Sequence, residues 1–236
     1  MTNLNKSRQT IGCQQCTIYA GDEPADFMLI QPVNGHDLTI LDNEVAAIEA
    51  NASKANFCLA AIEIKHWHDE LSPWTAPPVF GNMPFGSGAQ HTLHYITSTL
   101  MPHLAPICAN NAPTLIGGYS LAGLFALWCA YQEPAFAGAA AVSPSVWFPG
   151  WLDYAKSHRP TANSVYLSLG DKEHHTKTAI MKNVDSCITT QHSLLCSAMD
   201  TDRCILEWNV GNHFQDNDIR TARAFTWLIN SISSSK

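Results

Sequence analysis

The feature that most constrains the fold is a series of short and mostly continuous apolar runs separated by segments with helical periodicity. Apolar runs without polar interruptions are typical of strands that are covered on both faces. The runs lie at Phe27–Gln31, Phe57–Ile62, Thr114–Ile116, Ala137–Val142, Val165–Leu169 and Cys204–Val210. Alternating strands and helices predict an α/β fold with a mostly parallel central sheet and helices on both faces. In such sheets, ligands bind beyond the carboxyl ends of the strands.

The chain supplies enough apolar surface for one large core. It has 236 residues, of which 46% are hydrophobic and 14% are charged. Because we find no internal repeat and no linker, we expect residues 1–236 to form a single domain. The segment at about 66–87 is rich in Pro, Gly and aromatic residues, which predicts an irregular loop over the active-site end.

Charge and hydropathy exclude two classes of partner. The formal net charge of −7 argues against nucleic acid, which selects a basic surface. No run of about 18 apolar residues is present, so we expect no membrane-spanning helix. The first residues contain no apolar segment of the kind found in secretory signals, and we therefore expect a cytoplasmic protein. No feature of the sequence indicates an oligomeric state.

The eight cysteines do not predict a disulfide framework or a metal site. A chain of this length does not need disulfide bonds to be stable, and Cys58, Cys108 and Cys129 lie in apolar runs typical of the core. Cys13 and Cys16 form a C-x-x-C pair, but no second C-x-x-C supplies the two further ligands of a zinc site. We expect this pair to lie in a surface hairpin with reduced thiols.

Two histidine pairs are also weak candidates for metal binding. His66 and His68, and His174 and His175, lack the i, i+4 spacing that places two ligands on one helix face. We expect solvated or pocket-lining roles for them. The sequence therefore predicts neither a metal nor an organic cofactor.

The stretch IGGYSLAGLFALW at residues 116–128 places a serine at a sharp strand-to-helix turn. It resembles the G-x-S-x-G pattern, with Ala122 at the last position. The turn forces strained φ and ψ on Ser120, and its neighbours Gly118 and Ala122 are small enough to avoid a clash. Ser120 would then lie at a helix N-terminus, where the Leu121 N–H can stabilise an oxyanion. The pattern by itself is compatible with either a nucleophile or an ordinary turn.

The order of later polar residues favours the nucleophile. Serine needs a histidine base that is itself oriented by a carboxylate. A strand ending at Gly170 is followed by Asp171 and Glu173, and the next strand is followed by His213. Serine, acid and histidine thus occur in the chain order of the strand–turn–helix hydrolases.

Either of two carboxylates could serve as the acid. Glu173 is three residues beyond Gly170, so the loop has room to turn its side chain back toward His213. Asp171 directly follows the strand and could instead bond the loop backbone, as Asp often does in turns. We favour Glu173.

These stretches resemble the esterase D-type esterases of the α/β-hydrolase superfamily. That group includes siderophore esterases, S-formylglutathione hydrolases and feruloyl esterases. The resemblance lies in the elbow at Ser120, in SPSVWF at 143–148 and in SPW at 72–74, and it covers roughly residues 25–230. It implies an α/β-hydrolase fold and a hydrolase of carboxylic esters with the triad Ser120, Glu173 and His213.

The sequence departs from this family after the third family strand. The usual histidine–glycine or aspartate–glycine is replaced by Gln31–Pro32. Because proline has no N–H, we place the second oxyanion donor at Val33, by position only. Leu121 is expected to be the first donor.

The expected reaction is hydrolysis of a small-molecule ester through an acyl-enzyme. An acyltransferase would use the same triad, and sequence does not separate the two. A non-catalytic binding protein with this fold is disfavoured because it would not need all three residues. Trp74, Trp147 and Phe148 could form flat walls for the substrate, although aromatic side chains also serve as core.

Overall fold

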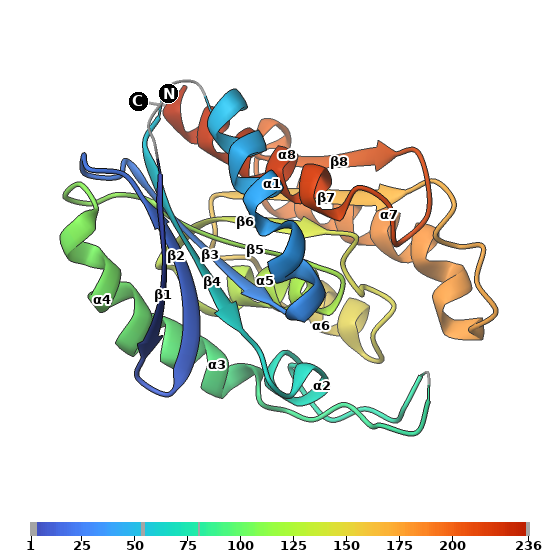
Figure 1. Cartoon of the computed structure of the whole chain (residues 1–236). Coiled ribbons are helices and arrows are strands. Elements are labelled where there is room, and N and C mark those ends of the chain that lie inside the picture. The colour runs from blue at the N-terminus through green and yellow to red at the C-terminus, as the bar shows by residue number, and fades with distance from the viewer. Residues whose placement is uncertain (1–3, 53–54, 80, 235–236) are drawn as a thin grey trace.

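The computed structural model describes residues 4–52, 55–79 and 81–234. Its centre is a strongly twisted sheet with helices on both faces (Figure 1). The strands are β1 Asn5–Ile11, β2 Gln14–Ala20, β3 Phe27–Val33, β4 Phe57–Glu63, β5 Thr114–Tyr119, β6 Phe136–Val142, β7 Ser164–Gly170 and β8 Cys204–Asn209. Their order across the sheet is β1-β2-β4-β3-β5-β6-β7-β8. This is the predicted α/β-hydrolase architecture.

Most of the sheet is parallel, as predicted. Strands β3 to β8 pair in parallel, whereas β1 pairs with β2 and β2 pairs with β4 in antiparallel fashion. Residues of β3 and β7 are buried along the whole strand, which explains why their sequences are mostly apolar.

The hairpin of β1 and β2 has no counterpart among the apolar runs of the sequence. The first six residues of β1 are exposed and polar, because β1 is an edge strand that packs no face into the core. Cys13 lies in the turn of this hairpin and is exposed, while Cys16 is buried with its Sγ 3.4 Å from Tyr95 Oη. The C-x-x-C pair therefore lies in a hairpin as expected, but only Cys13 is at the surface, because Cys16 faces the core.

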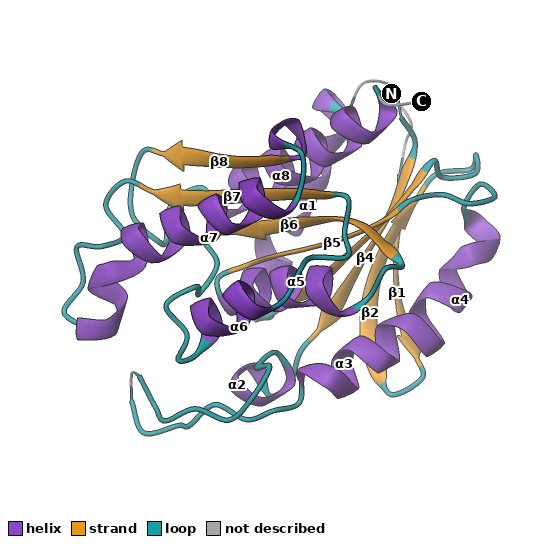
Figure 2. Cartoon of the chain, turned by 180° about the vertical axis from the view of Figure 1, so that it is seen from behind, coloured by secondary structure: helices purple, strands orange, loops and turns teal. Residues whose placement is uncertain are grey.

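The helices cover both faces of the sheet. They are α1 Gly35–Asn51, α2 Trp67–Glu70, α3 Ala89–Tyr95, α4 Met101–Leu104, α5 Leu121–Gln132, α6 Trp151–Ser157, α7 Val184–Ala198 and α8 Asn217–Ser233. Helices α1 and α8 pack against each other on one face, and the view from behind shows α3 to α7 in front of the other (Figure 2). Short helical turns lie at Ile96–Leu100, Ala105–Ile107, Ala179–Asn183 and Thr201–Arg203.

The core consists of two apolar clusters, one on each side of the sheet. One contains Leu41 and Ile48 of α1 with Phe225 and Leu228 of α8. The other is centred on α5, in which all residues from Leu121 to Tyr131 are buried. Helix α5 is therefore enclosed on every side, which holds its N-terminus firmly at the end of β5.

Candidate active site

Ser120 lies in the turn between β5 and α5. Its φ of 60° and ψ of −118° are in a region that residues with a Cβ rarely occupy. A Cβ added to Gly118 would lie 2.7 Å from the Cβ of Ala122. The turn therefore accepts alanine at position 122 because Gly118 has no side chain.

His213 follows β8 and reaches the serine. Its Nε2 lies 3.0 Å from the Oγ of Ser120. The Oη of Tyr119 donates a 3.0 Å hydrogen bond to the backbone carbonyl of His213. The residue before the serine thus fixes the backbone of the histidine.

Glu173 lies on the opposite side of the imidazole from Ser120. Its Oε2 is 2.7 Å from His213 Nδ1, while its Oε1 accepts from the Gly170 N–H at 2.7 Å and from Ser143 Oγ at 2.7 Å. Burial by itself raises the pKa of Glu173, but the hydrogen bond and charge of His213, with the bonds from Ser143 and Gly170, outweigh it and lower the pKa to about 2. The side chain of Glu173 is therefore ionised over the whole physiological pH range.

Arg220 of α8 forms an ion pair with this carboxylate. It is 2% exposed, and its Nη2 lies 3.0 Å from Glu173 Oε1 and also donates to Ser143 Oγ. Its Nη1 donates to Tyr119 Oη at 2.7 Å. One buried guanidinium therefore connects the acid, the strand that carries the serine and the loop after β6.

Asp171 does not contact His213. Its Oδ1 accepts the Gly211 N–H at 2.8 Å, so it ties the loop after β7 to the loop after β8. This is the backbone role that the sequence left open for Asp171, and Glu173 is the carboxylate that the structure brings to the histidine.

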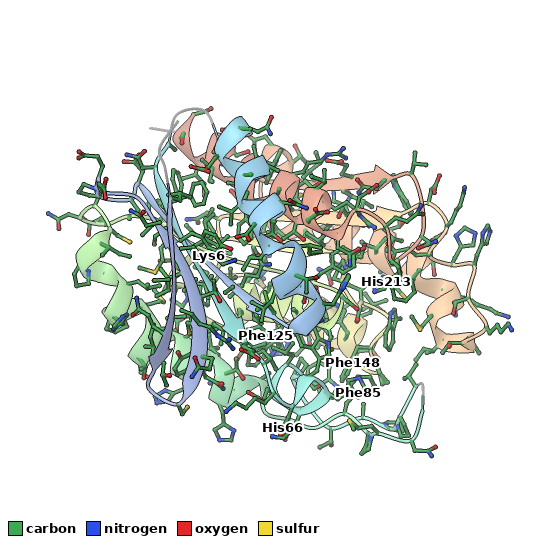
Figure 3. All side chains as sticks on the ribbon, in the orientation of Figure 1. Lys6, His66, Phe85, Phe125, Phe148 and His213 are labelled. Carbon is green, nitrogen blue, oxygen red and sulfur yellow. The ribbon has the colours of Figure 1, made fainter. Side chains whose placement is uncertain are left out.

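A cavity of about 550 Å³ opens beside Ser120. His213 and Phe85 face this same side of the molecule, beyond the carboxyl ends of the strands (Figure 3). Its walls come from the loop before α3, from the elbow, and from the loops after β6, β7 and β8: Trp67, His68, Phe85, Ser120, Leu121, Ser145, Trp147, Lys172, Glu173, His175, Thr176, Thr178, Met181, Asn212, His213 and Phe214. The irregular segment at 66–87 therefore does supply part of the wall.

The three aromatic residues proposed for the pocket have different positions. Trp147 lines the cavity, whereas Trp74 and Phe148 do not. Phe148 is 2% exposed and packs edge-on against Phe85 with ring centroids 5.0 Å apart. Trp74 donates from Nε1 to the carbonyl of Pro149 at 2.8 Å. These two residues form the layer of packing behind the wall.

The two expected oxyanion donors also differ in placement. Leu121 is the first residue of α5 and lines the cavity. Val33 is the last residue of β3 and is fully buried, with its carbonyl bonded to the Ile64 N–H at 3.0 Å. The next residue, Asn34, lines a smaller cavity together with Ser120 and His213.

Two residues of the site, Arg220 and Phe214, were not identified from sequence. Arg220 belongs to an amphipathic helix, where nothing in the sequence separates a buried arginine from a solvated one. Phe214, directly after His213, is 85% exposed and forms the lip of the cavity. Its position beside a candidate base was the available signal.

Among the residues that the structure describes, the His and Glu side chains of the cavity wall form no close group of three that could hold a metal ion. A cluster of three metal-ligating side chains does occur elsewhere in the described chain, at His192, Cys196 and Cys204. Within the same residues, no helix combines the length and the hydropathy needed to span a bilayer.

The mostly parallel eight-stranded sheet with helices on both faces has the α/β-hydrolase fold. The family model described as "Putative esterase" matches residues 31–196, which is most of the chain. The chain belongs to this family, and it is accordingly a hydrolase of carboxylic esters. No curated protein matches its sequence.

Solved structures of similar fold include several esterases. The siderophore hydrolase EstA from Aspergillus nidulans has 16% identity and a TM-score of 0.71, with 99% of this chain and 95% of that chain covered. An IroE-like serine hydrolase from Shewanella oneidensis has 13% identity and a TM-score of 0.75, with 95% and 79% covered. The enterobactin esterase FES from Shigella flexneri, solved in the presence of enterobactin, has 14% identity and a TM-score of 0.65, with 99% and 59% covered. At these identities the likeness establishes the fold.

Proposed function

We propose that the protein is a serine esterase in which Ser120, His213 and Glu173 form a catalytic triad. The observation that carries the proposal is the continuous chain of contacts from Ser120 Oγ to His213 Nε2 at 3.0 Å and from His213 Nδ1 to Glu173 Oε2 at 2.7 Å. Each of the three residues follows the carboxyl end of a different strand. These distances are those of a nucleophile, its base and the group that orients the base.

The reaction would proceed in two halves. His213 Nε2 takes the proton of Ser120 as Oγ attacks the ester carbonyl, and the resulting imidazolium then gives that proton to the leaving alcohol. In the second half His213 removes a proton from water, which attacks the acyl-enzyme and releases the acid. Glu173 stays ionised throughout and stabilises the imidazolium.

The oxyanion would be bound by two backbone N–H groups. Leu121 supplies the first, because it directly follows Ser120 and begins α5, whose N-terminus also favours negative charge. We place the second at Val33, at the end of β3. Loss of one such donor typically lowers the rate by about 10²–10³.

The cavity favours an ester with a sizeable apolar part. Its wall includes Phe85, Trp147 and Met181, and the basic side chain of Lys172 also reaches it. Similarity in fold to siderophore hydrolases makes ester-linked siderophores a first class to test. Simple aryl esters of increasing acyl length should measure how much apolar area the wall can cover.

A fluorophosphonate probe tests the nucleophile directly. The probe should label Ser120 in the native protein, and Ser120→Ala should lose both the label and the hydrolysis of p-nitrophenyl esters. Ser145 lines the same cavity and provides a matched control, so Ser145→Ala should keep the label. Peptide mapping that finds the label on another residue, or no label on folded protein, would sink the assignment.

A further inference from the structure

A second cluster of reactive side chains lies where α7 is followed by β8. His192 and Cys196 are one helical turn apart near the end of α7, and Cys204 is the first residue of β8. The ligand atoms of these three residues all lie within 4.8 Å of one another. His192 Nε2 is 3.5 Å from Cys196 Sγ, which is 3.2 Å from Cys204 Sγ.

We propose that His192, Cys196 and Cys204 form a binding site for a thiophilic divalent metal ion of the Zn²⁺ class. Two thiolates and one imidazole are a ligand set that zinc prefers, and hard cations such as Mg²⁺ would need oxygen ligands instead. A fourth position would be filled by water or by an external ligand. The two thiols bind as thiolates, so their protons pass to the solvent as the ion binds.

The distances agree with a tetrahedral ion after a small adjustment. Metal–sulfur bonds of about 2.3 Å and metal–nitrogen bonds of about 2.0–2.1 Å require about 3.8 Å between two sulfurs and about 3.6 Å between sulfur and nitrogen. The observed sulfur–nitrogen distance of 3.5 Å already fits. The two sulfurs, at 3.2 Å, would move apart by about half an ångström, which a small side-chain rotation supplies.

The cluster is partly buried and can be reached from the solvent. Cys204 is 5% exposed, while His192 and Cys196 are half-buried, so an ion can enter from the solvent side of α7. The i, i+4 spacing of His192 and Cys196 keeps both side chains on one helix face. The site therefore has two ligands on one rigid element and one on its neighbour.

The cluster is separate from the esterase site. Cys204 pairs with Val165 near the beginning of β7, whereas Glu173 and His213 follow the other ends of β7 and β8. The two sites thus lie at opposite ends of the strands, the cluster at the amino end and the esterase site at the carboxyl end. A bound ion would tie the end of α7 to the beginning of β8, and α7 in turn packs against both strands.

A disulfide between Cys196 and Cys204 is the competing interpretation, because their sulfurs are already close. A disulfide would not involve His192. The chain also contains a matched thiol pair, Cys58 and Cys108, whose sulfurs are 3.4 Å apart. The residues described by the structure add no third metal-ligating side chain to that pair. A comparison of the two pairs separates metal binding from thiol proximity.

Cobalt titration tests the proposal. The full-length protein is reduced with a phosphine, stripped of metal and titrated with Co²⁺ under nitrogen. We expect a thiolate-to-cobalt absorption band and the visible bands of tetrahedral cobalt to saturate at one equivalent, and Zn²⁺ to displace them. Cys204→Ser and Cys196→Ser should lose the thiolate band, and His192→Asn should weaken binding by at least about tenfold. Cys108→Ser and Cys187→Ser should behave like the native protein.

Other results of the same titration would contradict the proposal. Absence of a thiolate band in reduced native protein, or a band that survives Cys204→Ser, overturns the site. Native affinity in His192→Asn overturns the three-ligand arrangement and leaves only a thiol pair. Should Cys204→Ser fail to fold, Cys196→Ser, at a half-buried position, gives the same decision.

A second measurement is thermal unfolding. Zn²⁺ should raise the Tm of the native protein and not that of the ligand variants. Ser120→Ala should bind cobalt normally, so the result does not depend on the esterase mechanism.

Discussion

Arg220 Nη2 lies 3.0 Å from Glu173 Oε1, and both side chains are almost completely buried. The other carboxylate oxygen of Glu173 faces His213. The guanidinium therefore fixes the carboxylate on the side away from the imidazole, which leaves one oxygen aimed at His213 Nδ1. The ion pair uses Nη2, while Nη1 donates to Tyr119 Oη and so links the guanidinium to the strand that precedes Ser120.

We predict that Arg220→Met lowers kcat much more than it changes KM. The substitution leaves the buried Glu173 carboxylate without its cation, and breaking a buried ion pair typically costs about 3–5 kcal/mol of stability. Arg220→Lys keeps the charge but cannot reach Ser143, Glu173 and Tyr119 together, so it should recover stability more than kcat. Steady-state kinetics and urea unfolding measure both. A purely structural arginine would leave kcat per folded molecule unchanged.

Glu173→Gln should reduce kcat by about two to four orders of magnitude, because an amide cannot stabilise the imidazolium as a carboxylate does. Asp171→Asn is the matched control. Its remaining carbonyl oxygen can still accept the Gly211 N–H, so its kcat should stay within a few-fold of the native value. The reverse ranking of the two variants in an ester hydrolysis assay would transfer the role to Asp171.

Gly118→Ala should destabilise the protein by about 1–3 kcal/mol through overpacking. The new Cβ would meet the Cβ of Ala122 at 2.7 Å and its backbone carbon at 2.8 Å. Gly35→Ala provides the control, since a Cβ at Gly35 has nothing within 4 Å, and its stability should change by less than about 0.5 kcal/mol. Denaturant unfolding compares the two, and equal effects would argue against a tight elbow.

Stability should fall with rising pH because of Glu44. Burial in α1 raises the pKa of Glu44 to about 8, against a hydrogen bond from Gln31 that lowers it. A free glutamate has a pKa of about 4.3, so between about pH 5 and pH 8 the folded state holds a proton that the unfolded chain has lost. The protonated Glu44 therefore contributes stability at low pH. This contribution is lost as the pH rises through the window, and above about pH 8 the stability no longer changes because of Glu44.

Glu44→Gln removes this titration and isolates it. The stability of the native protein relative to the variant should decline by up to about 1.4 kcal/mol per pH unit across the window. Urea unfolding of both proteins at several pH values measures the difference. Parallel curves for the two proteins would show that Glu44 does not titrate on unfolding.

The parallel part of the sheet was predictable because its strands are covered on both faces. The mostly apolar sequences of β3 and β7 follow directly from that burial. The same reasoning brought Ser120, Glu173 and His213 together, because each follows the carboxyl end of a parallel strand and these ends lie on the same side of the sheet. Strand β1 was missed because its exposed edge position demands no apolar residues.

The detailed environment of the site was not predictable for a different reason. Loops determine it, and loop paths depend on contacts between residues far apart in sequence. Phe148 and Trp147 are neighbours in the chain, yet only Trp147 lines the cavity. The pairing of Arg220 with Glu173 similarly depends on how α8 packs across the sheet, which no local pattern encodes.

The hydrogen bond from Tyr119 Oη to the carbonyl of His213 has a dynamic consequence. Serine and histidine belong to loops at the ends of two strands that are separated in the sheet by β6 and β7. A displacement of the β5 end would carry the histidine backbone with it, so thermal motions of the two loops become correlated. The distance between Ser120 Oγ and His213 Nε2 should then fluctuate less than the position of either residue.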